Sequence, residues 1–205
     1  FPDFVLGNKS PGIGVSTLLD NANERVGHCA YWTTPDGETR HIVAIGWATG
    51  TVTTGDDITV QIESIDAATG FPNGIIAVGR SGTQTVANGD DNAWLETSLG
   101  THYDLISGAW LAVTWKMTNG SKNLNIIHSY LLHGALQAPM YSWVCTDIAG
   151  AATWVKLATG VTNCALITDT GEYILPLGGY CMEVSSSINI ANDHDDPTVR
   201  YIGNK

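Results

Sequence analysis

Apolar and polar residues alternate with a period of two over much of this chain, and this pattern limits how the chain can fold more than any other. Within residues 58–63, isoleucine and valine alternate with threonine, glutamine and glutamate, and similar alternation recurs in residues 109–118 and 153–158. Successive side chains of a strand point to opposite faces, so each segment predicts a β-strand with one buried face and one more polar face. Helical spacing is convincing only in residues 16–20, which are too few for an isolated helix.

Glycine, asparagine, aspartate and proline separate these segments in combinations typical of tight turns. So many strands without crossover helices pack as two antiparallel sheets or as a closed barrel. No repeat of the roughly 40–50 residues that a propeller blade needs is found. We therefore expect an all-β fold, an antiparallel two-sheet β-sandwich of jelly-roll type. The predicted strands cover residues 25–32, 39–48, 57–65, 75–79, 93–99, 109–118, 123–130, 140–146, 153–158, 162–168, 172–176 and 180–190.

The chain has 205 residues, which is enough to bury a substantial core. We expect an extended N-terminal arm over residues 1–22, a β-sandwich domain over residues 23–190 and an extended C-terminal arm over residues 191–205. The sequence begins at Phe1 and carries a polar segment at residues 192–197. Ends of this kind are expected of a segment of a larger assembly, or of a chain whose leader has been removed.

The acidic composition of the chain argues against some classes of binding partner. Nine lysines and arginines stand against 20 aspartates and glutamates, which gives a formal net charge of −11 with no basic cluster. Binding of nucleic acid through its phosphates needs grouped basic residues, so we expect no nucleic-acid partner. No apolar run approaches the roughly 20 residues of a membrane-spanning helix, so we expect no membrane partner.

Two stretches carry a family resemblance. Residues 51–63 lead into the loop Thr69-Gly70-Phe71-Pro72-Asn73-Gly74, and residues 91–99 precede the strand start Ser107-Gly108-Ala109-Trp110. This layout resembles jelly-roll β-sandwich modules of structural and appendage proteins of tailed phages, which also recur in secreted bacterial proteins. The match covers roughly residues 40–118 and extends more loosely to residue 180. It implies a sandwich fold and a place in a particle or appendage, whereas a fold alone does not define a function.

Candidate catalytic residues are few. We expect Glu63 and Glu96, which lie in mid-strand, to be solvated residues on strand faces; the alternative is that both face one cleft, as glycoside hydrolysis requires of its two carboxyl groups. No serine nucleophile elbow, zinc-protease helix or phosphate-binding glycine loop is present. The six histidines include no pair at a zinc-binding spacing, so we expect them to be ordinary polar residues. We therefore expect that the protein is not an enzyme.

Aromatic residues are the strongest candidates for recognition. Alternation places Trp115 on the core face of its strand and Trp110 on the opposite face. In the strand over residues 153–158, it likewise places Trp154 on the polar face. Exposed tryptophans can stack sugar rings or anchor a protein–protein contact. Trp110 and Trp154, together with Tyr103 and Tyr141, are therefore the candidate ligand-binding residues. The alternative is that loops cover both tryptophans.

Oxygen ligands suggest a possible structural calcium ion, and no other cofactor is expected. The candidate ligands are Asp193, Asp195 and Asp196, with the acidic turns at residues 55–57 and 89–91 as alternatives. None of these segments has the EF-hand pattern.

Four widely spaced cysteines exclude a Cys-x-x-Cys site. Cys29 and Cys181 lie in the first and one of the last predicted core strands, which neighbour each other in many jelly rolls, so they are the candidate disulfide. Free buried cysteines are the alternative, because phage structural proteins assemble in a reducing cytosol.

These observations favour a non-enzymatic structural or appendage protein of a virus-like (phage) particle, located in a virion or outside the cell. Its expected partners are further copies of itself or other virion proteins, with at least one arm packed on a neighbouring copy, and glycans are possible ligands. The alternative is a carbohydrate-binding module that uses exposed tryptophans. A glycan-cleaving enzyme that uses Glu63 and Glu96 is a lesser alternative.

Overall fold

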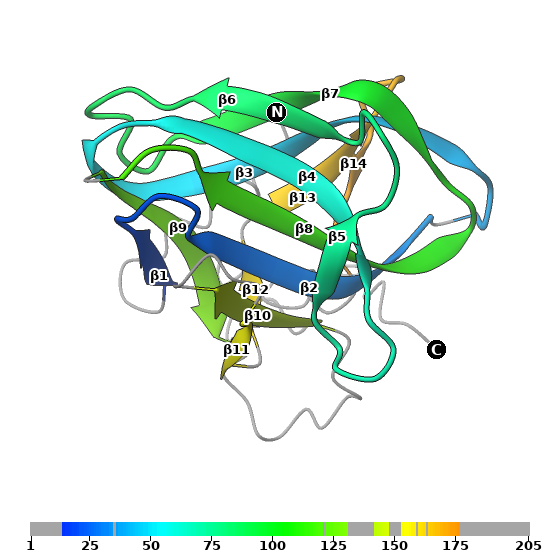
Figure 1. The fold of residues 1–205 in the computed structure, drawn as a ribbon. Coiled ribbons are helices and arrows are strands. Elements are labelled where there is room, and N and C mark those ends of the chain that lie inside the picture. The colour runs from blue at the N-terminus through cyan, green and yellow to red at the C-terminus, as the bar shows by residue number, and fades with distance from the viewer. Residues whose placement is uncertain are drawn as a thin grey trace, which may run out of the picture.

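The computed structural model describes residues 14–34, 36–120, 122–130, 142–147, 153–158, 160–162 and 164–176. Within these residues the secondary structure consists of fourteen β-strands and no helix (Figure 1). The strands form two sheets in which every pairing is antiparallel. The predicted all-β, two-sheet antiparallel sandwich is therefore confirmed.

The first sheet is built around the long strand β3, and we call it the β3 sheet. Its order is β1-β9-β3-β13-β14, with β12 beside β9 and β7 beside β3. The strands are β1 (Gly14–Leu19), β3 (Arg40–Thr54), β7 (Trp94–Leu105), β9 (Asn123–Tyr130), β12 (Gly160–Thr162), β13 (Cys164–Thr168) and β14 (Tyr173–Ile174).

The second sheet, called the β8 sheet, has the order β11-β10-β2-β8-β4-β5, with β6 also paired to β4. Its strands are β2 (Arg25–Thr33), β4 (Asp57–Ile65), β5 (Pro72–Ile75), β6 (Ser81–Thr85), β8 (Gly108–Met117), β10 (Ser142–Asp147) and β11 (Val155–Ala158). Strands β2, β4 and β8 pair over most of their lengths and form the regular centre of this sheet.

Strand β3 curls the sheet to which it belongs. Its first part pairs with β7 on one side and β13 on the other, whereas its last part, from Thr49 to Thr54, pairs with β9. Register shifts interrupt all three pairings. Such irregularities bend a strand and increase its twist, which explains how one strand can change partners along its length (Figure 1).

Strands β6 and β7 bring the two sheets together along one edge. The amide of Thr101 donates a hydrogen bond to the carbonyl of Gly79, at 2.7 Å. At Gly82 in β6, an added Cβ would lie 2.0 Å from the carbonyl oxygen of Ser98 in β7. Only glycine therefore fits at residue 82, and its lack of a side chain allows this close approach.

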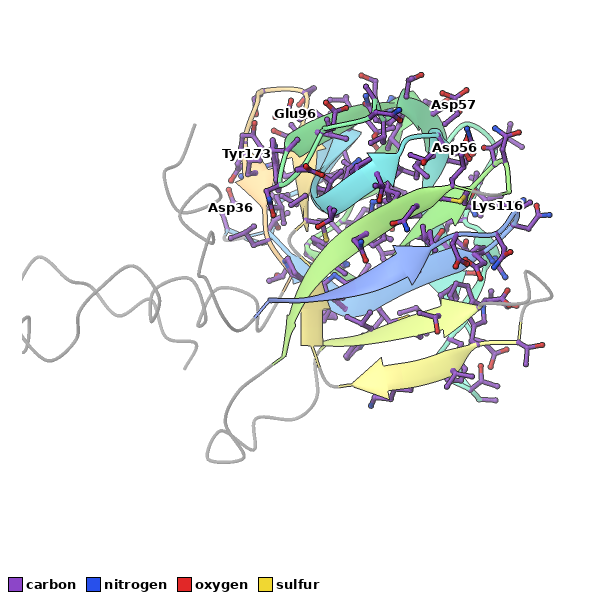
Figure 2. The ribbon with its side chains drawn as sticks, turned by 90° about the vertical axis from the view of Figure 1, so that its left-hand side faces the viewer. Asp36, Asp56, Asp57, Glu96, Lys116 and Tyr173 are labelled. Carbon is purple, nitrogen blue, oxygen red and sulfur yellow. The ribbon has the colours of Figure 1, made fainter. Side chains whose placement is uncertain are left out.

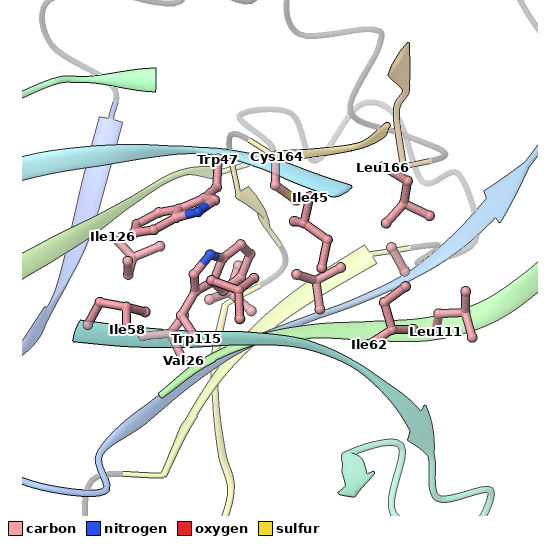
Figure 3. Close-up of a cluster of buried hydrophobic side chains, with 14 of the residues drawn as sticks. Val26, Ile45, Trp47, Ile58, Ile62, Leu111, Trp115, Ile126, Cys164 and Leu166 are labelled. Atoms are coloured by element: carbon pink, nitrogen blue, oxygen red, sulfur yellow. The ribbon is translucent and has the colours of Figure 1, made fainter. Parts of the chain in front are cut away.

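Among the side chains that the structure describes, three fully buried tryptophans fill the space between the sheets: Trp32, Trp47 and Trp115. Trp47 from the β3 sheet faces Trp115 from the β8 sheet, with 6.3 Å between ring centroids (Figure 3). The indole N–H of Trp47 donates to Thr97 Oγ1 at 2.9 Å, and that of Trp32 donates to the carbonyl of Leu111 at 3.3 Å. Branched aliphatic side chains surround the rings and make one continuous core.

The structure refines the predicted boundaries. The strand expected over residues 93–99 continues to Leu105, and the strand expected over residues 39–48 continues to Thr54. The strand expected over residues 75–79 is wrong for most of its length, because β5 ends at Ile75 and a turn follows.

The predicted arms have different outcomes. Residues 14–19, which were expected in the N-terminal arm of residues 1–22, form β1 and pair with β9, so the sandwich includes this segment. Residues 1–13 and 177–205 lie outside the described residues, and with them lie the C-terminal arm and the strand predicted over residues 180–190. The jelly-roll strand order stays a prediction.

Candidate functional site

The predicted recognition residue Trp110 lies on the outer face of the β8 sheet, where 43% of its surface is exposed. Its neighbour in the chain, Leu111, points into the core. Tyr31 of β2 is directly opposite Trp110, and their rings meet edge to face with centroids 5.5 Å apart. Aromatic pairs favour this geometry. The sequence identified Trp110 but missed Tyr31, whose place depends on the pairing of β2 with β8.

Trp154 does not extend this surface. It is half-buried and packs against the outer apolar cluster, a small group formed by Cys29, Ala112 and Cys145 on the outer face of the β8 sheet. The guanidinium carbon of Arg25 lies 4.4 Å from the ring centroid, so a cation occupies one face of the indole. Trp154 is therefore covered by Arg25 and the outer apolar cluster rather than open for sugar stacking, whereas the alternative that loops cover both tryptophans is wrong for the exposed Trp110.

The two predicted tyrosines do not join Trp110 in the described structure. Tyr103 belongs to β7 in the other sheet, where it is half-buried and packs against the core. Burial, followed by the charge of Asp104, raises the pKa of its phenol. Tyr141 lies outside the described residues, as do the calcium candidates Asp193, Asp195 and Asp196.

Glu63 is fully buried rather than solvated, and it forms the centre of a polar network on the outer face of the β8 sheet. Its carboxylate accepts hydrogen bonds from Thr114 Oγ1 at 2.7 Å, Gln61 Nε2 at 2.6 Å and the amide of Gly74 at 2.8 Å. Arg25 Nη1 lies 3.8 Å from the same carboxylate. Four groups that carry hydrogen-bond donors thus surround this buried charge, as its burial requires.

Arg25 links Glu63 to a second buried carboxylate. Its Nη2 donates to Asp147 Oδ2 at 2.7 Å, and its Nε donates to the same oxygen at 3.3 Å. Asp147 has no exposed surface. Arg25 also covers Trp154, so this one side chain connects the polar network with the outer apolar cluster.

The two candidate catalytic carboxylates are not brought together. Glu63 follows the core residue Ile62 and therefore points outward from the β8 sheet. Glu96 precedes Thr97, which hydrogen-bonds the core residue Trp47, so Glu96 points outward from the β3 sheet. The pair occupies opposite faces of the sandwich, whereas glycoside hydrolysis needs carboxyl groups about 5–10 Å apart across one cleft.

Glu96 instead belongs to a surface contact with Tyr173 (Figure 2). The phenol of Tyr173 donates a hydrogen bond to Glu96 Oε1 at 2.6 Å, and the indole N–H of Trp94 donates to the same oxygen at 3.2 Å. Burial, followed by this hydrogen bond and the negative charge of Glu96, raises the pKa of Tyr173 to about 12.

His41, His102 and Asp104 form a cluster on the outer face of the β3 sheet. His41 of β3 lies opposite Asp104 of β7, and His102 precedes Asp104 by two residues on the same face. His41 Nδ1 is 2.7 Å from Asp104 Oδ1, and His102 Nε2 is 3.3 Å from the same oxygen. The rings of the two histidines meet edge to face with centroids 5.1 Å apart.

The electrostatics of this cluster favour the ionised carboxylate. The hydrogen bond with His41 lowers the pKa of Asp104, burial opposes this effect, and nearby histidine and arginine groups add to the lowering. The three side chains are close enough to ligate one metal ion, and these residue types are metal ligands.

The sequence did not predict this cluster, because the strand expected over residues 93–99 ends before His102 and Asp104. Residues 102 and 104 share a strand face only if the strand continues through Gly100, as it does. The His-x-Asp spacing was the available signal. The position of His41 could not be found without the register of β3 against β7.

The described cysteines are buried thiols. Cys29 and Cys145 adjoin each other in the outer apolar cluster, and the hydrogen bond between them, followed by burial, raises the pKa of Cys29. Cys29 is a free thiol in the structure and Cys181 lies outside the described residues, so the bridge predicted between them is not seen.

Cys164 lies on the inner side of the sandwich beside a buried histidine. Its Sγ is 3.4 Å from His28 Nδ1, and Thr162 Oγ1 lies 2.7 Å from the same nitrogen. Both His28 and Cys164 are buried, with 0% and 4% exposure. This geometry satisfies a polar group within the core and gives the thiol almost no contact with solvent.

The described residues thus define an all-β protein built as a two-sheet sandwich. Comparison with family models, curated proteins and solved structures gives no match to this sequence. The resemblance to phage sandwich modules accordingly stays a prediction. None of the described residues belongs to a helix of the length and apolar character needed to cross a membrane.

Proposed function

We propose that this protein is a non-enzymatic structural or appendage component of a virus-like (phage) particle, in a virion or outside the cell. It acts through protein–protein contact, and the contact uses the outer face of the β8 sheet around Trp110. The observation that carries this proposal is the exposed side chain of Trp110 on the paired strand β8, where it packs against Tyr31. Tryptophan and tyrosine are enriched among residues that dominate binding energy.

A second copy of the chain is the proposed partner. Like-charged chains repel, and each copy carries a formal charge of −11. The neighbours of Trp110 on this face, Tyr31, Thr33 and Gly108, are uncharged. Along β2 and β8, the described part of this face therefore places no carboxylate directly beside Trp110. The prediction that an arm also packs on the neighbouring copy concerns residues outside the described part of the chain.

Sedimentation velocity over a wide concentration range tests this proposal, with Trp110→Ser as the variant. The control is Val78→Ser, which removes another apolar side chain, 90% exposed, from the turn after β5. The wild type and the control should self-associate, and Trp110→Ser should shift the protein toward monomers. A wild-type chain that stays monomeric, or an assembly unchanged by Trp110→Ser, would refute contact at this face.

Carbohydrate binding is the second candidate, because the same exposed Trp110 could stack a sugar ring. A glycan array followed by titration calorimetry separates the two functions. Saturable glycan binding that Trp110→Ala abolishes, by a chain that remains monomeric, would favour the carbohydrate-binding module. Cleavage of a glycan has less support, since Glu63 and Glu96 face opposite ways.

A further inference from the structure

We propose that His41, His102 and Asp104 bind a divalent transition metal ion, with Zn²⁺ as the preferred ion, on the outer face of the β3 sheet. This site lies on the opposite sheet from Trp110 and does not depend on the function proposed for that residue.

The ligand atoms are already near the separations that a zinc site needs. Zinc bonds of about 2.0–2.1 Å in a tetrahedral arrangement place neighbouring ligand atoms about 3.3 Å apart. The distance from His102 Nε2 to Asp104 Oδ1 is 3.3 Å, and that from His41 Nδ1 to the same oxygen is 2.7 Å. Since all three ligand atoms lie within 4.8 Å of one another, small rotations of the side chains complete the site.

Three exposed side chains can make these rotations without disturbing the core. His41, His102 and Asp104 are 52%, 50% and 48% exposed, and none of the three belongs to the buried hydrophobic core. Their backbones are held by the pairing of β3 with β7, which fixes the two histidines on one face. Binding would exchange the histidine–aspartate hydrogen bonds for metal bonds and join the two strands.

The donor set selects the class of metal. Two imidazole nitrogens and one carboxylate suit zinc and its transition-metal neighbours, whereas calcium prefers six to eight oxygen ligands. Three protein ligands leave one position of a tetrahedral ion, which solvent can reach because the cluster is exposed. Water, or a donor group from another molecule, would occupy that position.

Titration calorimetry with Zn²⁺ on the full chain, purified without a histidine tag and treated with chelator, tests the site. The variants are His102→Ala and Asp104→Asn. The matched control is Asp57→Asn, which alters an exposed strand carboxylate that is hydrogen-bonded to Thr85. The wild type and the control should bind one equivalent, and each ligand variant should weaken the affinity by more than the about 10–100-fold lost when a group that only orients a metal ligand is removed.

Thermal unfolding and circular dichroism distinguish the loss of a metal ligand from the loss of the fold. Zn²⁺ should raise the Tm of the wild type and of the control, because a ligand that binds only the folded state stabilises it, and should not raise the Tm of either ligand variant. Without metal, the variants should keep the wild-type circular dichroism spectrum. The absence of one-equivalent binding, or binding that survives both His102→Ala and Asp104→Asn, would overturn the proposal. The outcome does not depend on Trp110→Ser, so the two proposals can fail separately.

Discussion

Replacing Glu63 with alanine tests how the outer face of the β8 sheet is stabilised. The substitution removes a carboxylate that has no exposed surface and accepts three hydrogen bonds. It leaves the hydroxyl of Thr114 and the amide of Gly74 without their acceptor. It also leaves Arg25, whose side chain is only 15% exposed, with one carboxylate partner, Asp147, instead of two.

The expected cost follows from these contacts. Removing one partner of a buried charged network destabilises a protein by about 3–5 kcal/mol, because the remaining groups stay buried without compensation. Glu63→Gln keeps the shape and one acceptor oxygen, so its cost should be nearer the about 1–3 kcal/mol of a single unsatisfied buried group. A loss of 3–5 kcal/mol is a large part of the about 5–15 kcal/mol by which domains are stable.

Urea denaturation followed by tryptophan fluorescence measures the free energy of unfolding for each variant. Glu96→Gln is the control, because it changes an exposed glutamate on the other sheet and should alter stability by about 0.5 kcal/mol or less. Thermal unfolding should show a drop in Tm of about 2–4 °C for each kcal/mol in a domain of this size. A double-mutant cycle with Thr114→Val should give a coupling energy of about 0.5–3 kcal/mol.

A cost of about 1 kcal/mol or less for Glu63→Ala, with an unchanged m-value, would refute a large contribution of Glu63 to stability. Such a result would mean that water or a moved side chain satisfies the network after truncation. A coupling energy near zero with Thr114→Val would reject the specific hydrogen bond while leaving the burial argument intact.

Three further predictions concern other parts of the molecule. Gly82→Ala should destabilise the protein at the upper end of the about 1–3 kcal/mol typical of overpacking, since the added Cβ meets the Ser98 carbonyl, and urea denaturation should detect this; an unchanged midpoint would contradict it. Burial alone would raise the pKa of Asp56, but hydrogen bonds from Asn119 outweigh it and lower the pKa below the ordinary 3.8. The ionised Asp56 therefore stabilises the fold above about pH 4, and this stabilisation is lost as pH falls through the folded pKa. The free energy of unfolding of Asp56→Asn, measured by urea denaturation at a series of pH values, should be lower than that of the wild type near neutral pH, and the difference should shrink in acid. A difference that stays constant down to about pH 2 would exclude this linkage. Because Cys29 is buried and its pKa is raised, iodoacetamide at pH 8 should alkylate it little until urea unfolds the chain. Mass spectrometry of the peptide that contains Cys29 measures the labelling, and rapid labelling of the folded protein would contradict the prediction.

The local alternation of apolar and polar residues was sufficient to predict most strands and which side chains they bury. Alternation predicted the strand over residues 57–65 with its observed bounds, and it placed Trp115 in the core and Trp110 outside. These features depend on neighbouring residues along one strand. The strand predicted over residues 93–99 stopped just before Gly100, whereas β7 continues through this glycine to Leu105. A glycine allows a turn, but pairing with a neighbouring strand can keep it extended.

Features that join distant segments could not be predicted in this way. Glu63 has the sequence context of a solvated strand residue, and its burial depends on Thr114 and Gly74, which approach from other strands. His41 and Asp104 are 63 positions apart, and their contact requires the register of β3 against β7. A one-residue change of register would move a side chain to the other face, so such sites depend on information absent from local pattern.

The pairings of β3 also constrain how the chain can fold during synthesis. Trp47 of β3 pairs with Cys164 of β13, which a ribosome adds about 120 residues later, or about 6–24 s later at about 5–20 residues per second. Until then β3 lacks one of its neighbours, and its edge, which carries Ile42, Ile45 and Trp47, is open to other nascent chains. The yield of folded protein should therefore respond to translation speed and to chaperones that cover exposed strand edges during this interval.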